Sequence, residues 1–475
     1  MMKKYVLIAA SLILICLVLV VAVNWSLLQQ IAVFHPIILP NFGPAPADEA
    51  EARLQDIEYL ANLVDYDRSF NEQEREMFAE LMANGRAQAA DMSLAELYLL
   101  AARAAALADN GHTNVHLTPL QRDFNAVGLR YFLFRDGLYI VRALKEYEQL
   151  IGARVIEIDG QPITSILNEM QSYFGGKESW RQLYAVRMLE SADILHAAGL
   201  AESPDGYTLT VQSQQGEVQQ VQLAARTPAA EDKPGRSFLE TLAAEALADE
   251  GDVWVHALQE FDDDLLPPFF QEMDQLYFWT PLPNEGGYFR LKNTVNDEQQ
   301  TLAEFYQETI EPLPEGSLRY LVVDLRLNDA GDLTLFADIA GRLPAKVADN
   351  GHLYIVVGPQ TFSGGLIPVA MLKYHGGDKA LIVGSPMGDR EQYWAERGML
   401  FQLPHAGFTV SYATGYHDWA AGCEDHPYCF TQVLKHGVKA GSLEPTHVIE
   451  AEYADYAAGK DVVLDWIAEQ EGPGS

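Results

Sequence analysis

From Gly286 onward, short apolar runs alternate with stretches of helical length, and this order constrains the fold more than any other feature of the chain. Strands are expected at 288–291, 320–325, 353–357 and 380–383, and helices at 299–309, 333–341 and 366–374. Alternation of this kind builds a sheet covered by helices, with functional groups at the strand ends. The sequence therefore predicts an α/β core over residues 286–470.

Three of these strands run into polar turns that contain glycine. The segments are LVVDLRLNDAG at 321–331, YIVVGPQTFSGG at 354–365 and ALIVGSPMGDR at 380–390. In the second segment Ser363 stands at the start of a helix, where free backbone amides can stabilise an oxyanion. A serine before two glycines is more often part of a plain turn, so this segment alone does not identify a nucleophile. The order and spacing of the three segments carry the information.

The chain before the core divides into a helical region and a β-rich module. Residues 49–118 are predicted to be helical, with a capping box at Ser93 and Glu96 and a turn, DNGHT, at 109–113. Residues 119–225 contain short strands, with a hairpin signal at 136–137. The phrase GARVIEIDGQPI at 152–163 is predicted to form a strand and a tight turn that lead into a helix. Residues 226–285 form an acidic connector without a readable pattern.

The N-terminus has the pattern of a membrane anchor. Lys3 and Lys4 precede an uncharged apolar run at 5–23, which is about long enough to cross a bilayer core as one helix. The lysines favour a cytoplasmic N-terminus. A cleaved signal peptide is the alternative, but VVAV at 20–23 is a poor cleavage site. We therefore expect a single-pass inner-membrane anchor at 1–28, a linker at 29–48, and the remaining domains in the periplasm or outside the cell.

The net charge argues against a nucleic-acid partner, and the cysteine spacing argues against a zinc site. The formal net charge of −35 repels phosphate backbones, so nucleic acid is not an expected partner. Cys423 and Cys429 lie in the segment GCEDHPYC, and export to an oxidising compartment would favour a disulfide between them. Zinc is disfavoured, because Cys423, His426 and Cys429 would offer three ligands in one cramped loop. We expect neither a metal nor a cofactor.

Taken in order, the three strand-end segments resemble the Asp-Leu-Arg-x-Asn-x-Gly-Gly, Thr-x-Ser-x-Gly and Val-Gly-Glu segments of the tail-specific, or C-terminal processing, serine proteases. NGHT at 110–113 is similar to the Asp-Gly-His-Thr segment of that family, and GSLEPTHV at 441–448 and AAGKDVVL at 457–464 match its closing segments. The resemblance covers roughly residues 90–470. It implies a helical N-terminal domain at 49–118, a PDZ-like module at 119–225, a connector at 226–285 and a ClpP/crotonase-like protease core at 286–470.

The resemblance also implies a nucleophile and an oxyanion hole. Ser363 occupies the position of the family's catalytic serine. The amide of Gly364 and an amide from the turn of Ala330 and Gly331 would hold the oxyanion. The substrate would be a protein or a peptide, captured by strand addition to the PDZ-like module.

The general base departs from the family's usual pattern. Bacterial members commonly place a lysine where this chain has Arg390, and an arginine stays protonated and cannot act as a base. We expect Arg390 to pair with Asp389, Glu391 or a substrate carboxylate. A second branch, which includes the tricorn protease, uses a histidine at the His-Thr position. His112 occupies that position, and histidine suits proton transfer near neutral pH.

The acidic member of the triad is left open by the sequence. It should lie between the strand expected at 408–412 and residue 445. Asp418, in TGYHDW at 414–419, is the first choice. The alternatives are Glu424, Asp425 and Glu444.

Two other functions compete with an active endopeptidase. A peptide- or ligand-binding protein without catalysis is favoured by Arg390 and by Ala330, which stands where a glycine is expected, but Ser363 and His112 oppose it. An α/β-hydrolase esterase requires a glycine two residues before the serine, and this chain has a threonine there.

Overall fold

The computed structural model describes residues 25–34, 38–41, 43–227, 237–247, 250, 253–262 and 265–472. The predicted membrane segment at 5–23 lies outside these ranges. Within them, no helix combines the length and the hydrophobicity that a membrane crossing requires.

Helices form the first part of the described chain. Their bounds are α2 (Trp25–Val33), α3 (Glu49–Leu60), α4 (Leu63–Tyr66), α5 (Glu72–Gln88) and α6 (Leu94–Ala106). The predicted capping box of α6 is present, since Glu96 N donates to Ser93 Oγ at 3.2 Å and Ser93 N donates to the Glu96 carboxylate at 2.7 Å. Alanine and leucine side chains of α6 are buried in a core that the helix shares with the middle region, residues 119–225. The C-terminal end of α6 therefore has a fixed position.

The middle region contains a seven-stranded sheet and more helix than the sequence pattern indicated. The path of neighbouring strands is β1-β2-β3-β5-β6, with β4 paired to β3 and β7 paired to β2. The predicted hairpin at 136–137 joins β1 to β2. Three helices lie between β4 and β5. The first, α8, is where the sequence predicted a helix, and the other two, α9 and α10, add to the expected β-rich module. The elements are α7 (Thr118–Arg122), β1 (Leu129–Phe134), β2 (Gly137–Leu144), β3 (Arg154–Ile158), β4 (Gln161–Pro162), α8 (Ile163–Gln171), α9 (Glu178–Met188), α10 (Ala192–Ala197), β5 (Gly206–Gln212), β6 (Val218–Ala224) and β7 (Trp254–His256).

The core is a six-stranded sheet in the order β17-β12-β11-β10-β9-β8, parallel except for the edge strand β8. All four predicted strands and all three predicted helices are present in it, with shifted ends. The elements are β8 (Tyr277–Leu282), β9 (Gly286–Leu291), α11 (Leu302–Thr309), β10 (Leu318–Asp324), α12 (Ala337–Arg342), β11 (Val347–Val357), α13 (Leu366–Gly376), β12 (Ala380–Gly384), β17 (His447–Val448), α15 (Tyr453–Ala457) and α16 (Val462–Gln470).

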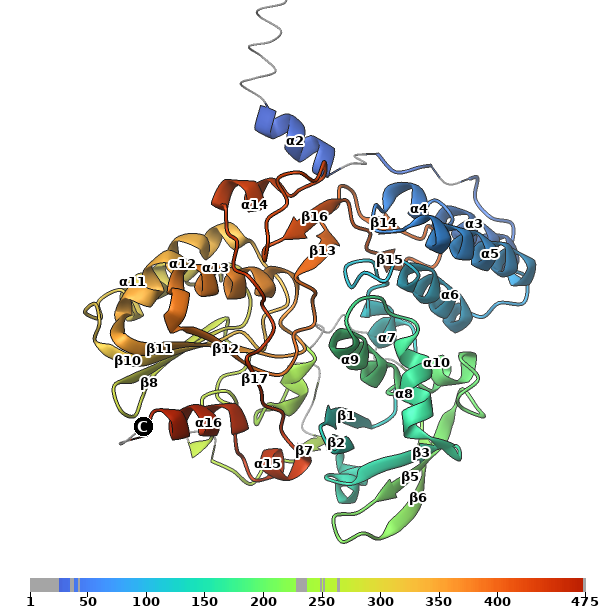
Figure 1. Cartoon of the computed structure of the whole chain (residues 1–475). Coiled ribbons are helices and arrows are strands. Elements are labelled where there is room, and N and C mark those ends of the chain that lie inside the picture. The colour runs from blue at the N-terminus through green and yellow to red at the C-terminus, as the bar shows by residue number, and fades with distance from the viewer. Residues whose placement is uncertain are drawn as a thin grey trace, which may run out of the picture.

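Helices cover both faces of this core sheet. Figure 1 shows α11, α12 and α13 on one side of the sheet and α16 on the other. Leu321, Val323 and Ile355 belong to the apolar cluster beneath α13, whereas Val322 and Tyr354 belong to the cluster beneath α16. Because the side chains of successive strand residues alternate between the two faces, each face of the sheet is packed against an apolar cluster. This packing holds the strand ends rigidly.

A strap of short strands connects β12 to β17. It contains β13 (Gln392–Ala395), β14 (Phe401–Gln402), β15 (Thr409–Val410), β16 (Gly415–Asp418) and α14 (Thr431–His436). The strand expected at 408–412 is confined to the two residues of β15. The expected disulfide between Cys423 and Cys429 is present, with a Cα–Cα distance of 5.5 Å.

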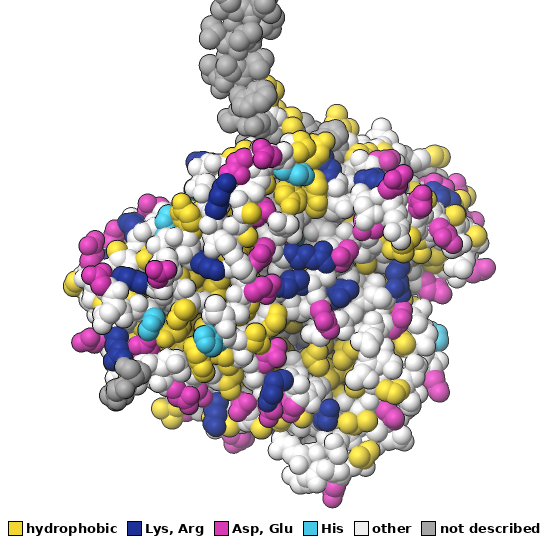
Figure 2. Space-filling model, viewed as in Figure 1, with side chains coloured by type: hydrophobic (Ala, Val, Ile, Leu, Met, Phe, Trp, Pro, Cys, Tyr) yellow, Lys and Arg dark blue, Asp and Glu magenta, His cyan; other side chains and the backbone are white. Residues whose placement is uncertain are grey.

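The surface carries acidic and basic groups side by side. Figure 2 shows Asp and Glu side chains interspersed with Lys and Arg over the visible face. At the N-terminal end of the described chain, Leu27, Leu28 and Ile31 of α2 are exposed, whereas Val33 is buried.

Candidate functional site

Ser363 lies in a strained turn between β11 and α13. Its φ of +52° is in the left-handed region, which a non-glycine residue rarely adopts and which is typical of functional turns. Hydrogen bonds fix the turn on both sides. Thr361 Oγ1 donates to Leu325 O at 2.8 Å, and Phe362 N donates to Asn328 O at 3.0 Å. The end of β11 is thereby held against the turn that follows β10.

The turn after β10 places a second backbone amide beside the serine. A Cβ atom on Gly364 would lie 2.5 Å from Gly331 N, so the two backbones touch in a way that only glycine allows. Gly331 has φ +139°, and a Cβ atom there would meet Thr294 O at 2.3 Å. No hydrogen bond among the described residues occupies the amides of Gly331 and Gly364. These two N–H groups can therefore receive an acceptor atom, whereas Ala330 O accepts from Thr294 N.

His112 is brought to Ser363 by a turn that several segments hold. Thr113 Oγ1 donates to Asp67 Oδ2 at 2.6 Å, and burial raises the pKa of the Asp67 carboxyl. Asn110 Nδ2 donates to Trp394 O at 3.0 Å in the strap. Arg390 donates from Nη1 to Asp109 O and from Nη2 to Asp109 Oδ2, both at 2.7 Å. The side chain of Arg390 thus pairs with Asp109, where the sequence suggested Asp389 or Glu391.

The carboxylate of Asp389 joins the histidine to the serine turn. His112 Nε2 lies 2.8 Å from Asp389 Oδ2, and Ser363 N donates to the same oxygen at 3.2 Å. Asp389 is buried, with 4% of its side chain exposed, and His112 is 12% exposed. Because a carboxylate only accepts, this geometry puts the imidazole proton on the nitrogen that faces Asp389 and leaves the other nitrogen able to accept one.

Both faces of the His112 ring are covered by aromatic rings. Phe362 stacks on one face at 4.4 Å between centroids, and Tyr393 stacks on the other at 5.0 Å. Burial, followed by the charges of Asp389 and Glu396, raises the pKa of the Tyr393 phenol, which therefore stays neutral. Three more rings extend this stack on both sides, and we call the whole stack the ring series. Between centroids, Trp180 lies 3.9 Å from Phe362, His417 lies 4.6 Å from Tyr393, and Phe430 lies 4.6 Å from His417.

A cavity of about 300 Å³, which we call the serine cavity, opens beside Ser363 and the two glycine amides. Its remaining walls come from α13, from the start of the 3₁₀ turn after Gly331, and from the strap. The lining includes Ile367, Tyr393, Glu396, His417, Phe430 and Asp332.

The other acidic candidates do not reach the histidine. Asp418 accepts from Gln392 Nε2 at 2.8 Å and from the backbone amides of the turn that follows it. Glu424 pairs with Lys439, and Glu444 pairs with Lys177. The structure therefore brings Ser363, Gly331, Gly364 and His112 together, and puts Asp389 where Asp418 was expected.

A buried amide links the serine turn to a second region. Gln360 Nε2 donates to Leu327 O and to Asp329 Oδ2, both at 3.1 Å, while Gln360 Oε1 accepts from Leu239 N at 2.9 Å. Burial raises the pKa of Asp329 to about 6, even though Gln360 donates to it. Asp329 immediately precedes the Ala330-Gly331 turn, so its protonation state bears on the oxyanion amides.

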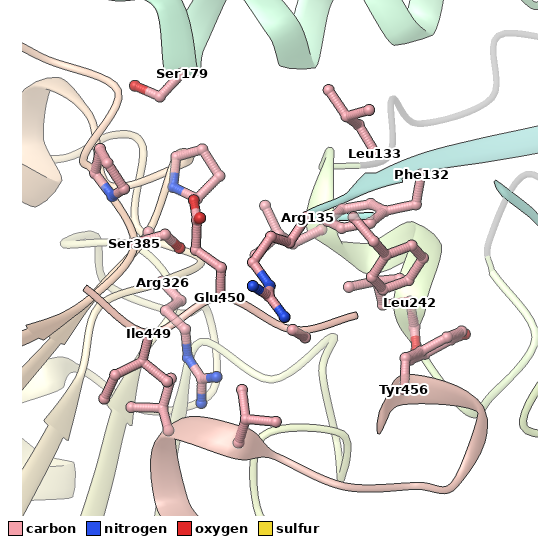
Figure 3. Close-up of a pocket in the computed structure, with 18 of the residues that line it drawn as sticks. Phe132, Leu133, Arg135, Ser179, Leu242, Arg326, Ser385, Ile449, Glu450 and Tyr456 are labelled. Carbon is pink, nitrogen blue, oxygen red and sulfur yellow. The ribbon is translucent and has the colours of Figure 1, made fainter. Parts of the chain in front are cut away.

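A second cavity, of about 530 Å³, lies between β1, α9 and the chain that leads from β17 to α16, and we call it the β1 cavity. Figure 3 shows Phe132 and Leu133 of β1 on one side and Ile449 and Glu450 on another, with Tyr456 beside Leu242. Phe134 pairs with Gly137 across a two-residue turn, so it exchanges hydrogen bonds with β2 and Leu133 directs its backbone groups to the open edge. β1 ends the path of neighbouring strands.

Sequence reasoning missed Asp389, Glu396 and His417. Asp389 lies in the quoted 380–390 segment, beside the position that replaces the family's lysine, and His417 immediately precedes Asp418. Both were visible as neighbours of candidate residues. Nothing in the sequence pattern shows that Glu396 faces the serine.

A scan of protein-family models and a search of curated proteins found no match to this chain. Among solved structures, an alanine mutant of CPAF matches with a TM-score of 0.58 and 13% identity, over 89% of this chain and 96% of that one. Mature CPAF in complex with lactacystin matches with a TM-score of 0.55 and 15% identity, over 89% and 98%.

This chain has the fold of CPAF. The predicted multidomain α/β architecture is thereby confirmed. The photosystem II D1 C-terminal processing protease and the tricorn protease also match, at 14% identity each. They cover 85% and 89% of this chain and 93% and 37% of theirs, and their TM-scores of 0.32 and 0.37 are too low to support an argument.

Proposed function

We propose that this protein is a serine endopeptidase of the tail-specific type, with Ser363 as nucleophile and His112 as general base. The observation that carries the proposal is the shared carboxylate oxygen. His112, about 250 residues before Ser363 in the chain, meets the same Asp389 oxygen that accepts from the Ser363 amide. Nucleophile, base and orienting acid are the parts that acyl transfer needs.

The proposed reaction starts with attack of Ser363 Oγ on the carbonyl carbon of a peptide bond. His112 takes the hydroxyl proton, and the carbonyl oxygen gains its negative charge beside Gly331 N and Gly364 N. The carbon–nitrogen bond then breaks as His112 gives the proton to the leaving amine. Water, activated by His112, hydrolyses the acyl-enzyme and frees Ser363.

We assign the orienting role to Asp389 in place of Asp418. A carboxylate that accepts from an imidazole N–H fixes the ring and stabilises the imidazolium that forms during the reaction. Asp389 makes this contact at 2.8 Å, whereas the Asp418 carboxylate caps the turn at 419–421. Arg390 is then a positioning residue, since it holds the turn that carries His112.

The β1 cavity suits capture of an extended peptide. We assign residues 119–225 as a PDZ-like module and 286–470 as a ClpP/crotonase-like protease core, joined by the connector 226–285. A peptide strand can pair with the open edge of β1 at Leu133, and apolar residues of the cavity can receive its side chains. The helical domain at 49–118 supplies the turn with His112.

We also propose that the catalytic part works in the periplasm beside the inner membrane. The apolar run at 5–23 and the two lysines before it support this location. The exposed Leu27, Leu28 and Ile31 continue the apolar run into the described chain. A disulfide between Cys423 and Cys429 fits an oxidising compartment.

The test is covalent labelling by a fluorophosphonate probe, followed by mapping of the modified peptide. Ser363 should be labelled, and the variants Ser363→Ala and His112→Ala should each lose labelling and at least about 10³-fold in peptide cleavage, as members of one catalytic unit. Ser385→Ala is the matched control, because Ser385 also follows a core strand but lines the β1 cavity. Cleavage that survives Ser363→Ala, or labelling elsewhere, contradicts the proposal.

A further inference from the structure

The serine cavity contains a carboxylate and a buried imidazole that the proposed chemistry does not use. Glu396 and His417 both line it, together with Ser363. Glu396 follows β13 with φ +58°, and Thr414 fixes its backbone by donating from N and Oγ1 to Glu396 O at 2.9 and 3.0 Å. The strained backbone holds the Glu396 side chain, 25% exposed, against the cavity.

His417 directs a buried N–H toward the Glu396 carboxylate without a well-formed hydrogen bond. Trp419 Nε1 donates to His417 Nδ1 at 3.2 Å, so the proton of the neutral ring is on Nε2. Within the described chain, His417 Nε2 is buried without a hydrogen-bond partner, although Glu396 Oε1 lies 3.3 Å away. Only 2% of the His417 side chain is exposed. A buried, unsatisfied polar group that faces a cavity is typical of a site for a ligand.

The charges of the lining are of one sign. Glu396 and Asp332 are carboxylates, and the described lining contains no lysine or arginine. Asp332 Oδ1 accepts from the amide and the hydroxyl of Thr334, which fixes that carboxylate at the cavity wall. The two carboxylates thus favour a cation, and the half-enclosed site screens the attraction less than bulk water does.

Apolar rings cover the rest of the wall. Phe430 and Tyr393 stack on the two faces of His417, and Ile367 lies on the α13 side. Long cationic side chains place their methylene groups on apolar surface and their charged end at a polar partner. An aromatic face also attracts a nearby cation.

We propose that the serine cavity binds a lysine or arginine side chain of the substrate, with Glu396 as the residue that selects it. This inference rests on the proposed function, in which the bond that Ser363 attacks follows the selected residue. His417 is a positioning residue, since its Nε2–H faces the Glu396 oxygen and the ring is held by Trp419.

The first experiment measures binding and needs no turnover. Full-length Ser363→Ala protein is titrated with N-acetyl-arginine N-methylamide and with its norleucine and glutamine counterparts. The arginine compound should bind at least about 10-fold more tightly than the norleucine compound. Glu396→Gln should remove most of this preference and Asp332→Asn part of it, while Glu424→Gln, an exposed carboxylate paired with Lys439, should leave it unchanged.

Equal affinities, a preference that survives Glu396→Gln, or tightest binding of the glutamine compound each overturn the inference. The second experiment compares cleavage after arginine with cleavage after leucine in otherwise identical peptides. The ratio of the two kcat/KM values should fall about 10- to 100-fold in Glu396→Gln. If Glu396-dependent binding is found but no peptide is cleaved, the cation site stands and the proposed function fails. If cleavage occurs without that binding preference, only the inference fails.

Discussion

The serine cavity and the β1 cavity are lined by different kinds of chemical groups. Backbone amides, a strained serine and stacked rings define the serine cavity of about 300 Å³. Phenylalanine and leucine side chains and an open strand edge define the β1 cavity of about 530 Å³. The first geometry can fix a single bond and one side chain, whereas the second can accept many sequences through main-chain hydrogen bonds. Chemistry and capture are therefore separable in this molecule, and substitutions should affect them separately.

The largest effect is expected at Asp389. Asp389→Asn keeps the shape of the side chain but offers an N–H or a neutral carbonyl to His112 in place of a carboxylate. We expect kcat for peptide cleavage to fall about 10²- to 10⁴-fold, with peptide binding at β1 unchanged. Asp418→Asn is the matched control, and its loss should stay under about 5-fold. The reverse ranking of the two variants would return the orienting role to Asp418.

The second effect concerns Asp329, which lies between the cavities. Its pKa in the folded protein is about 6, above the usual value of 3.8, so the folded state holds the proton more tightly than the unfolded state does. Its contribution to stability is therefore greatest below pH 4 and is lost as the pH rises through about 6. The free energy of unfolding of Asp329→Asn, minus that of the unmodified protein, should rise by about 2 kcal/mol between pH 4 and pH 7, because most of the interval between the unfolded and folded pKa values lies in that range.

Urea unfolding at a series of pH values would measure this difference, with Asp349→Asn, fully exposed, as the control. A difference that is flat with pH would show that Gln360 and the surrounding backbone keep Asp329 ionised in the folded state.

The smallest effect is expected at the edge of β1. Leu133→Pro removes the N–H that faces the β1 cavity and retains a residue that edge strands tolerate. Loss of one main-chain hydrogen bond should raise KM for long peptides about 5- to 10-fold, while kcat for a short ester substrate stays within about 2-fold. A matched Val218→Pro at the other end of the sheet should leave both constants unchanged. An equal loss on short and long substrates would mean that capture and chemistry are not separable.

The sequence predicted the core sheet well because its strands are buried on both faces and read as continuous apolar runs. Ser363, Gly331 and Gly364 became candidates because each lies where such a strand ends and matches a family segment. His112 became a candidate only through the resemblance, because nothing local in DNGHT shows that this turn meets residue 363. That contact depends on how segments that are distant in the sequence pack together.

The sequence did not indicate the contact between Asp389 and His112 for the same physical reason. Asp418 ends β16 and Asp389 lies in the loop before β13, and local pattern cannot tell which carboxylate points at the histidine. The helix after residue 163 was predicted, whereas α9 and α10 were not, because short strands dominate the pattern on both sides of them. Tertiary packing of α8 and α9 against the sheet stabilises them.

The ring series through His112 limits how the middle region can move relative to the core. Its successive rings are nearly parallel, with interplanar angles between 4° and 28° from Trp180 of α9 to Phe430 of the strap. Parallel rings lose little energy when they are offset sideways, but their thickness prevents closer approach. Small shear of α9 is thus permitted, whereas compression is not. A peptide that pushes on α9 would displace the imidazole within its own plane, which is the direction in which its two nitrogens point.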